Sequence, residues 1–421
     1  MKIVLIQHVC FLNGIGGTEK ICSILANLFV ANGYQVEIVT NEDVIGGAVF
    51  PLNKSVRVTN IYDPNIEQIE EIPLYNYKGK NPLLWIKYKA KKKYAKWYNR
   101  RLRKRMGGEE QIYLFNLRNR AQVWARFFKR EKPDLIITMS IASLVEVTFE
   151  NSLRIPIINS VNGRPDYDYS DTLGQRPFYL FRLLKNAFSE LNGIQILFDN
   201  YRSFLPDNFK GRIAVIHNPI DHIEPNKLVL HTIEKIRYKI IHVARLDIGC
   251  KQQDLAIAVF SALATKYPEW DLEFWGIGPD YEILHMQIAN FGLGERIFLR
   301  GFTDDPIAEM QKSDIFIFPS KYEGFGLALA EAMSVGLPCI GLSSCSGVNE
   351  LIVNGENGFL ANSAEEMEYF LERLMGDAAL RQQIGFKASL SMKRYSKTAM
   401  ERGWLDLVES VTKNDNYEQN G

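Results

Sequence analysis

Two glutamates with seven residues between them stand in the stretch "FPSKYEGFGLALAEAMSVGLPCI", residues 318–340. A strand pattern ends just before this loop, so we expect Glu323 in the loop and Glu331 in the helix that follows. The backbone N–H groups at residues 325–327, where the helix begins, could hold an anion. Glu331 would then accept hydrogen bonds from a diol such as a ribose, and Glu323 would face whatever the anion carries. Carboxylates at this spacing also occur on solvated helix faces, so the pair alone leaves both interpretations open.

Two cations follow an earlier strand of the same half of the chain. In "HVARLDIGCKQQDLAIAVF", residues 242–260, Arg245 ends the strand pattern and Lys251 stands six residues later, before a helix. Arginine offers a planar fork of donors and lysine a compact charge, and together they suit a diphosphate. A structural ion pair is an equally open interpretation of Arg245.

Two more turns follow strand patterns in this half. "FWGIGPD", residues 274–280, contains Gly276 and Gly278, and "RGFTD", residues 300–304, contains Phe302. The carboxyl ends of parallel strands lie along one edge of a sheet, where doubly wound folds bind ligands. Four turns of this kind at strand ends of one domain therefore predict one shared binding site.

A glycine-rich turn also follows the first strand pattern, "KIVLI", near the N-terminus. In "FLNGIGGTEKICSILANLF", residues 11–29, Gly16 and Gly17 would let a ligand approach the start of a helix closely. The dinucleotide fingerprint G-x-G-x-x-G is not met, because Glu19 holds its third glycine position, and no triphosphate loop G-x-x-x-x-G-K-[ST] occurs. A tight turn without a ligand remains an open alternative.

The segment at residues 78–105 is strongly basic, with 13 Lys/Arg and no Asp/Glu in a chain whose net charge is +1. Its aromatic and apolar residues are spaced for one stripe of a helix. A basic helix with an apolar face suits an anionic membrane surface. A stripe that packs on its own domain is the main alternative, and no motif accompanies the segment that would indicate nucleic acid. The residues of the expected stripe are Leu84, Tyr88, Ala95, Tyr98 and Leu102.

The elements that must position these residues alternate between strand and helix along the whole chain. Two complete sets of such alternation predict an α/β protein with two doubly wound parallel sheets. We expect an N-terminal domain at residues 1–217 and a C-terminal domain at residues 218–394, because proline and asparagine cluster in "VIHNPIDHIEPN". A last helix, at about 395–413, could pack back on the first domain.

Composition is that of an ordinary globular protein, with 421 residues and 46% apolar residues. The five cysteines form no pair or cluster of metal-ligand spacing, which favours a reducing compartment. No apolar run is long enough to span a membrane. We expect no signal peptide before the first strand, because "MKIVLI" runs directly into "QHVCFLNG". We therefore expect a cytoplasmic protein, which could also be peripheral on the inner face of the membrane.

Taken together, these motifs resemble glycosyltransferase family four, the retaining nucleotide-sugar enzymes of GT-B architecture. The element from Glu323 to Glu331 with "GFGL" resembles the family's E-x(7)-E motif, and "VARLD…K" resembles its diphosphate site. "GIGP", "HNP" at 217–219, "ELIVNGENGFL" at 350–360 and "GGTE" are also similar to family patterns. The likeness covers most of the chain and is strongest from about 213 to 361.

The resemblance implies transfer of a sugar, with retention, from a nucleoside-diphosphate sugar to an acceptor hydroxyl. UDP is the commonest donor nucleotide of that family. A lipid-linked glycan is the acceptor that the basic segment favours, and neither a cofactor nor a metal is expected. The implied catalytic residues are Glu323, Arg245 and Lys251, and the implied donor-binding residues are Gly16, Gly17, Gly276, Gly278, Phe302, Phe325, Gly326, Leu327 and Glu331.

One position departs from the family pattern. Many relatives carry a histidine near the reacting sugar, where "IINSVNGRP" places Asn162. Asparagine can bind a sugar hydroxyl but cannot act as an acid or base at pH 7. His8 could approach the same place, although a packed or surface histidine is the commoner case. The Asp-x-Asp at residues 166–168 resembles a cation motif of a different glycosyltransferase fold, and we do not expect it to bind metal.

Two other functions fit the same fold. A nucleotide-sugar epimerase would need acid and base groups in the cleft and no acceptor. A non-catalytic subunit that binds sugar nucleotides would bind without turnover, and a decayed site would be its signature. Glu323, Glu331, Arg245 and Lys251 are all present, which argues against decay. A glycan phosphorylase would need a pyridoxal-type lysine site that is not identifiable here.

Overall fold

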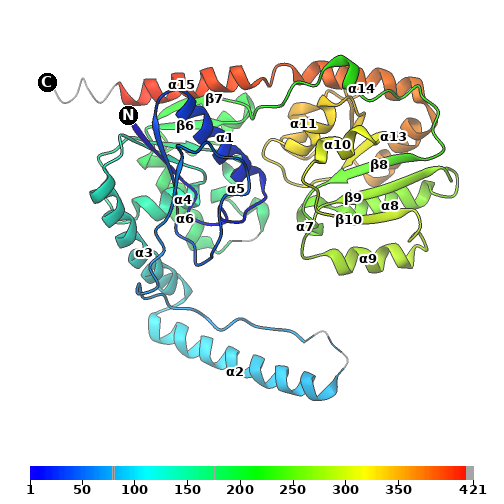
Figure 1. The fold of residues 1–421 in the computed structure, drawn as a ribbon. Helices are drawn as coiled ribbons and strands as arrows, with labels where there is room; N and C mark the ends of the chain where they lie inside the picture. The colour runs from blue at the N-terminus through cyan, green and yellow to red at the C-terminus, as the bar shows by residue number, and fades with distance from the viewer. Residues whose placement is uncertain (78, 80, 175, 414–421) are drawn as a thin grey trace.

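The computed structural model describes residues 1–77, 79, 81–174 and 176–413, which form two α/β domains facing each other (Figure 1). The N-terminal sheet has seven parallel strands in the order β3-β2-β1-β4-β5-β6-β7. Its central strands are almost fully buried, because helices cover both faces of a parallel sheet, whereas the edge strands β3 and β7 are partly exposed. They are β1 (Lys2–Ile6), β2 (Gln35–Thr40), β3 (Arg57–Asn60), β4 (Leu135–Thr138), β5 (Ile157–Ser160), β6 (Gly193–Ile196) and β7 (Arg212–Val215).

The helices of this domain connect successive parallel strands, as doubly wound topology requires. They are α1 (Gly17–Ala31), α2 (Pro82–Met106), α3 (Glu109–Glu131), α4 (Ile141–Thr148), α5 (Asp166–Tyr169) and α6 (Phe178–Ala187). Short 3-10 turns complete the connections at Asp171–Leu173, Phe188–Glu190, Asp199–Phe204 and, beyond β7, Pro225–Lys227. No helix in the described parts of the chain is both long and apolar enough to cross a membrane.

The C-terminal sheet has six parallel strands in the order β10-β9-β8-β11-β12-β13. Its strands are β8 (Tyr238–Val243), β9 (Trp270–Trp275), β10 (Ile297–Gly301), β11 (Ile315–Phe318), β12 (Cys339–Leu342) and β13 (Phe359–Ala361). Its helices are α7 (Ile248–Lys251), α8 (Gln253–Leu263), α9 (Tyr281–Asn290), α10 (Pro306–Gln311), α11 (Leu327–Ser334), α12 (Val348–Leu351), α13 (Ala364–Gly376) and α14 (Ala378–Met392). When the strands are numbered from one within each domain, the first six strands of each sheet follow the doubly wound order 3-2-1-4-5-6. This order confirms the predicted fold class.

The last helix, α15 (Lys397–Thr412), returns to the N-terminal domain (Figure 1). Trp404 lies edge-on to Phe29 of α1, with 6.2 Å between ring centroids, and Met400 and Val408 are buried beside them. The first sheet ends at β7 and the second begins at β8, so residues 216–237 connect the two domains.

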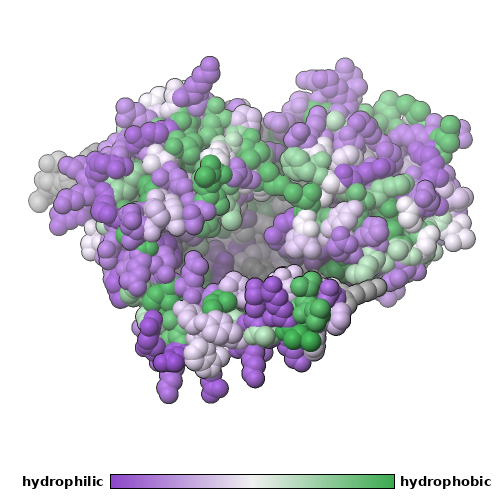
Figure 2. Space-filling view, turned by 60° about the horizontal axis from the view of Figure 1, so that its bottom comes forward, coloured by the Kyte–Doolittle hydropathy of each residue, from purple (hydrophilic) through white to green (hydrophobic). Residues whose placement is uncertain are grey.

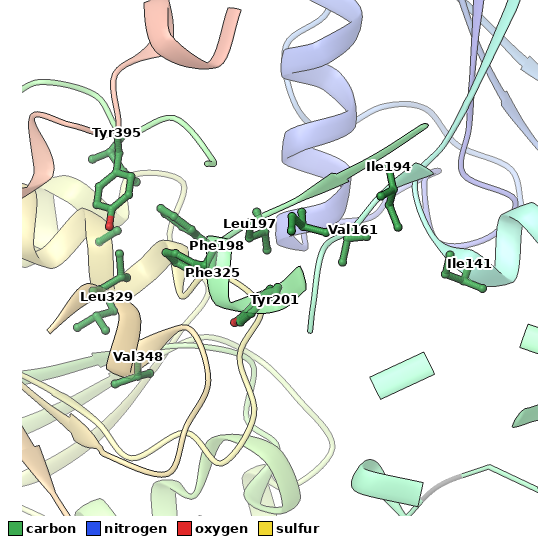
Figure 3. Packing of buried hydrophobic residues seen from close by; sticks show 14 of the residues in the cluster. Ile141, Val161, Ile194, Leu197, Phe198, Tyr201, Phe325, Leu329, Val348 and Tyr395 are labelled. Carbon is green, nitrogen blue, oxygen red and sulfur yellow. The ribbon is translucent and has the colours of Figure 1, made fainter. Parts of the chain in front are cut away.

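Apolar packing continues without a break from one domain into the other (Figure 3). Phe198, which follows β6, stacks on Phe325 of the C-terminal domain with ring centroids 5.3 Å apart. Tyr395, just before α15, meets Phe325 edge-on at 5.2 Å. Burial of this shared core stabilises the facing arrangement of the two domains.

Helix α2 projects beyond the body of the N-terminal domain (Figure 1). Asn81 caps its start by accepting hydrogen bonds from Leu83 N and Leu84 N, and a proline stands in its first turn. Only its C-terminal half packs on the domain, through the buried residues Ala95, Asn99 and Leu102.

The expected apolar stripe of α2 therefore divides into two parts. Ala95 and Leu102 are buried against the domain, whereas Leu84 and Tyr98 are 40% and 36% exposed. Apolar and aromatic side chains of α2 outside the expected stripe are more exposed than those of the stripe. They are Leu83, Ile86, Tyr94 and Trp97. Residues 78 and 80 of the predicted basic segment lie outside the described residues.

Candidate active site

Helix α11 begins where the predicted anion site was placed. The chain leaves β11, passes through the loop that holds Glu323 and enters the helix at Gly326, whose φ of 82° is the left-handed conformation that favours glycine. Phe325 is buried and fixes the loop against the N-terminal domain. Glu331 lies in the second turn of α11. The free N–H groups of the first turn of α11 therefore stand at the carboxyl end of the sheet.

Lys251 and Glu323 come together from elements 72 residues apart. Lys251 ends the short helix α7 and its Nζ lies 2.6 Å from Glu323 Oε1. The side chains are only 20% and 11% exposed. Burial is the largest influence and opposes the charge on Lys251, but the facing Glu323 carboxylate together with other neighbours raises the pKa of the lysine above its ordinary value. The lysine is thus a fixed cation at neutral pH, next to the start of α11.

Arg245 lies near the same edge but is oriented differently. Its guanidinium forms an ion pair with Asp247, and its side chain is 66% exposed. Its carbonyl oxygen accepts a hydrogen bond from Gln253 Nε2 at 2.8 Å, which fixes the backbone at the end of β8. The arginine can therefore turn its guanidinium without moving the strand end.

The glycine turn after β9 packs against the loop after β8. A Cβ at Gly276 would lie 2.0 Å from the carbonyl oxygen of Ala244, and one at Gly278 would lie 2.2 Å from that of Leu246. Glycine is required at both positions because the two loops touch through their backbones. Phe302, which follows β10, is 49% exposed at the same edge.

Helix α1 of the N-terminal domain begins opposite α11. A Cβ at Gly17 would come within 3.2 Å of Leu327 Cδ1, so the two helix N-termini approach closely. Lys20 Nζ of α1 lies 2.5 Å from Glu331 Oε1 of α11. Sequence analysis missed Lys20, although it directly follows "GGTE" and carries the charge opposite to that of Glu331.

Glu19, the residue that broke the dinucleotide pattern, turns back onto its own loop. Its Oε1 accepts a hydrogen bond from Gln7 Nε2 at 2.5 Å, and a Cβ at Gly16 would lie 2.4 Å from its Oε2. Burial raises the pKa of the Glu19 carboxyl, although hydrogen bonds from its own backbone N–H and from Gln7 oppose that rise. The carboxylate therefore does not occupy the space where the helices α1 and α11 meet.

The glycine loop itself is held by another carboxylate. Glu42 accepts hydrogen bonds from the backbone N–H groups of Cys10, Phe11 and Leu12, at 2.8 to 3.1 Å. A single buried anion thus fixes three consecutive residues of the turn after β1.

Asn162 lies where the two domains touch. Its Nδ2 donates to the carbonyl oxygens of Met139, at 2.8 Å, and Ser160, at 3.3 Å. A Cβ at Gly324 would lie 1.8 Å from the Asn162 carbonyl oxygen, so only glycine fits beside Glu323. Tyr201 Oη donates to the carbonyl oxygen of Gly324 at 2.8 Å and fixes the same contact.

A cavity of about 330 Å³ opens beside Asn162 in the N-terminal domain. His8 lines it, with Nδ1 2.9 Å from Ser143 Oγ, and burial lowers the pKa of the histidine below its ordinary value. His8 is therefore neutral at pH 7 and can exchange hydrogen bonds with a polar ligand. Glu19 and Asp168 also line this cavity.

The carboxylates of the Asp-x-Asp motif face arginines. Arg164 Nε lies 2.6 Å from Asp166, and Arg176 Nη1 lies 3.0 Å from Asp168. Across the described parts of the chain, no group of three or more His, Cys, Asp or Glu side chains has the arrangement of a metal site.

The structure thus brings Lys251, Glu323, Glu331 and the start of α11 to one place opposite Gly17. Arg245 and Phe302 lie on the same sheet edge with exposed side chains. Gly276 and Gly278 shape that edge through contacts between loops. This arrangement can hold a diphosphate between a buried lysine and two helix N-termini, with a carboxylate on either side.

Parts of the chain are similar in sequence to known proteins. A family model described as "Glycosyl transferases group 1" matches residues 229–390. The chain is 25% identical to a poly(glycerol-phosphate) alpha-glucosyltransferase of Bacillus subtilis over 347 residues, which are 74% of this chain and 50% of that relative. It is 28% identical over 244 residues to an N-acetylgalactosamine-N,N'-diacetylbacillosaminyl-diphospho-undecaprenol 4-alpha-N-acetylgalactosaminyltransferase of Campylobacter jejuni, covering 53% of this chain and 66% of that one. The chain therefore spans about half to two thirds of the length of these relatives.

A solved structure agrees in fold over nearly the whole chain. Staphylococcus aureus TarM, in complex with Fondaparinux, alpha-GlcNAc-glycerol and UDP, superposes with a TM-score of 0.70 at 15% identity. The superposition covers 96% of this chain and 99% of that one, and it supports the GT-B arrangement of the two domains.

Proposed function

The chain belongs to the glycosyl transferases group 1 family, and from this premise we propose that it is a retaining glycosyltransferase. It moves a sugar from a nucleoside-diphosphate sugar, with UDP as the nucleotide, to a hydroxyl of a glycan acceptor. The observation that carries this proposal is the convergence of Lys251, Glu323 and Glu331 at the start of α11, opposite α1. No metal is required in this proposal, because cationic side chains and helix N-termini face the diphosphate.

The donor would lie along the carboxyl edge of the second sheet. Lys251, with Arg245 turned inward, would bind the diphosphate together with the N–H groups at the start of α11. Glu331 would accept hydrogen bonds from the ribose, and Glu323 would orient the hexose. The bond between the sugar C1 and the phosphate oxygen breaks as the acceptor oxygen bonds to C1 on the same face. The departing phosphate oxygen takes the acceptor proton, so no protein nucleophile is needed.

The acceptor would enter from the N-terminal domain. The cavity of about 330 Å³ beside Asn162 is lined by hydroxyl, amide and imidazole groups that suit a sugar or polyol hydroxyl. Asn162 itself is engaged with two backbone carbonyl groups, so His8 is the more available partner for an acceptor hydroxyl.

Membrane contact through α2 is part of the same proposal, with a lipid-linked glycan as the acceptor. The exposed apolar side chains of α2, led by Leu83 at 75% and Ile86 at 58%, stand among lysines and arginines. Such a surface is attracted by anionic lipid headgroups and can insert its apolar side chains between them. The Campylobacter jejuni relative, whose name includes a diphospho-undecaprenol substrate, is consistent with this acceptor class.

The function is tested by incubating the protein with UDP-glucose, UDP-galactose and their N-acetyl forms, without acceptor, and following slow donor hydrolysis by NMR. We expect UDP release with the sugar first appearing as the α anomer, because retention applies to water as well. Lys251→Met should lower this rate about 10²–10³-fold, the scale for losing one preorganised donor to a departing anion. Interconversion of the UDP-sugars without UDP release would instead identify an epimerase, and first appearance of the β anomer would contradict retention.

A further inference from the structure

A second hollow, of about 820 Å³, lies away from the cleft between α2 and the loop that precedes it. Its aromatic side is formed by Tyr77, Trp85 and Tyr88, and its basic side by Lys89, Lys92 and Lys96. We call it the α2 groove. In Figure 2 the projecting helix α2 and the loop before it lie below the hollow between the two domains, and their surface carries both polar and apolar side chains.

The loop that forms one wall of the α2 groove is fastened to the helix. Asn99, buried in α2, accepts a hydrogen bond from Ile72 N at 2.9 Å and donates one to Ile72 O at 3.0 Å. One residue earlier, Glu71 forms an ion pair with Arg103, with Nη2 to Oε2 at 2.5 Å. These side-chain contacts replace the backbone pairing that a strand would have. These contacts hold the loop at residues 71 and 72 on α2, next to the groove. Within the groove, Lys92 Nζ donates a hydrogen bond to Asn76 Oδ1 and Tyr77 stacks on Tyr88, so a ligand anion at Lys92 has to share or replace the Asn76 contact.

The aromatic side of the groove offers flat faces. Tyr77 and Tyr88 are stacked, with ring centroids 5.3 Å apart and planes within 5° of parallel. Lys89 Nζ lies 4.4 Å from the centroid of the Trp85 ring. Trp85 is 49% exposed. Stacking closes the faces that Tyr77 and Tyr88 turn toward each other, so the rings open to a ligand are those of Trp85 and of Tyr75, which is 60% exposed. An exposed aromatic ring suits the apolar C–H face of a sugar, and the neighbouring ammonium groups suit anions.

The basic side of the groove repeats along the helix. Lys89, Lys92 and Lys96 are three and four residues apart, so they follow each other on one flank at about 4.5 and 6 Å along the axis. The described lining of the groove contains no acidic side chain. A bilayer surface cannot enter a concave space of this kind, whereas a single extended chain with repeating anionic groups can lie along it. Leu83, which does not line the groove, remains exposed for lipid contact.

We propose that the α2 groove binds an extended anionic glycan, in which carboxylate or phosphate groups repeat along sugar or polyol units. The aromatic side holds the rings and the lysines pair with successive charges. The identification of this glycan with the acceptor of the reaction rests on the proposed function, but the binding itself does not. A chain held on the projecting arm would raise the local concentration of its end near the cleft.

The test is a titration of the full chain with a fluorescently labelled octamer of polygalacturonate, followed by anisotropy. The double variant Lys92→Gln/Lys96→Gln should weaken binding about tenfold or more, because two charge-assisted contacts are lost. The matched control is Lys87→Gln/Lys104→Gln, which removes the same charge from α2 outside the groove and should change binding less than about twofold. Tyr88→Ala gives a second variant with unchanged charge and should also weaken binding.

Three outcomes would overturn the proposal. Equal losses in the two lysine pairs would indicate general attraction to a basic helix. Equal binding of inorganic polyphosphate, with no effect of Tyr88→Ala, would indicate an anion site without sugar recognition. Binding to vesicles of phosphatidylglycerol but not to the octamer would assign the groove to the membrane. Because the titration uses neither nucleotide nor turnover, it remains decisive even if the donor assay fails.

Discussion

Lys20 and Glu331 join two helices from different domains through one ion pair. The proposed ribose partner, Glu331, is therefore occupied by a lysine in this structure, at 2.5 Å. The side chains of Lys20 and Glu331 are 39% and 14% exposed, so solvent partly screens their attraction. The ion pair therefore contributes at most about 1 kcal/mol of stabilisation. A ribose diol that binds Glu331 has to compete with this contact.

Lys20→Met should therefore tighten binding of a nucleoside diphosphate. A competing interaction of up to about 1 kcal/mol corresponds to at most about fivefold in Kd. The measurement is a calorimetric titration with UDP, and Lys397→Met, a lysine at the start of α15, is the control. Weaker binding in Lys20→Met would show that the lysine serves the nucleotide instead of competing with it.

Glu19 makes the stability of the folded protein depend on pH, and its buried environment decides the direction of that dependence. Burial raises the pKa of its carboxyl above the ordinary value of 4.5, so the folded state holds this proton more tightly than the unfolded state. The stabilisation from protonated Glu19 is complete below pH 4.5 and is lost as the pH rises through the raised value. At neutral pH the buried charge costs stability.

Glu19→Gln should remove this cost. We expect its free energy of unfolding to exceed that of the natural protein by more at pH 8 than at pH 4.5, because the glutamine does not titrate. Urea unfolding at the two pH values measures the difference. An equal effect at both values would mean that the environment of Glu19 in solution does not favour the neutral form.

At the scale of the elements, the loops at the sheet edge depend on backbone contact. The turn after β9 and the loop after β8 touch at Gly276, whose φ is 142°. The sequence pattern identified this glycine as a ligand-binding residue, whereas the geometry shows that it also holds neighbouring loops together. The position of Arg245 depends on this contact.

Gly276→Ala should destabilise the protein by about 1–3 kcal/mol, because the added methyl group overlaps a backbone oxygen. The matched control is Gly294→Ala, since an added Cβ there meets nothing within 4 Å and the backbone is not left-handed. Urea unfolding of both variants checks this. Equal stability of the two would contradict the tight loop contact.

The two-sheet topology and the strand ends were predictable because they follow local patterns. Apolar runs bounded by glycine and proline locate β8, β9, β10 and β11, and the motifs lie directly after them. Contacts between domains were not predictable in this way. Lys20 and Glu331 are 311 residues apart, and Asn162 and Gly324 meet only after both domains have folded. The burial of part of the α2 stripe likewise depends on α3 and the preceding loop.

At the scale of the whole molecule, the domains are held in contact at the cleft. The Asn162 carbonyl oxygen lies where a side chain at Gly324 would have to be, and Phe198 stacks on Phe325 nearby. Closing such a cleft excludes water from the reacting groups. The interface therefore links the shape of the molecule to the chemistry of the site.

Gly324→Ala should keep the domains apart, because an added Cβ would lie 1.8 Å from the Asn162 carbonyl oxygen. Small-angle scattering should show a larger radius of gyration than in the natural protein, and donor hydrolysis should fall. Gly294→Ala again serves as the control. An unchanged radius of gyration would mean that the contact relaxes without any movement of the domains.

The most direct test of the account is a calorimetric titration with UDP, GDP and ADP of the natural protein, Lys251→Met, Arg245→Ala and Lys387→Met. Lys387 is an exposed lysine of α14 that is remote from the predicted site residues along the chain. Lys387→Met therefore removes one positive charge, as the other two variants do, and serves as the control. We predict that UDP binds, that Lys251→Met and Arg245→Ala each weaken it by about tenfold or more, and that Lys387→Met does not. Failure of every nucleoside diphosphate to bind, or equal binding by all four proteins, would contradict the placement of the donor at this sheet edge.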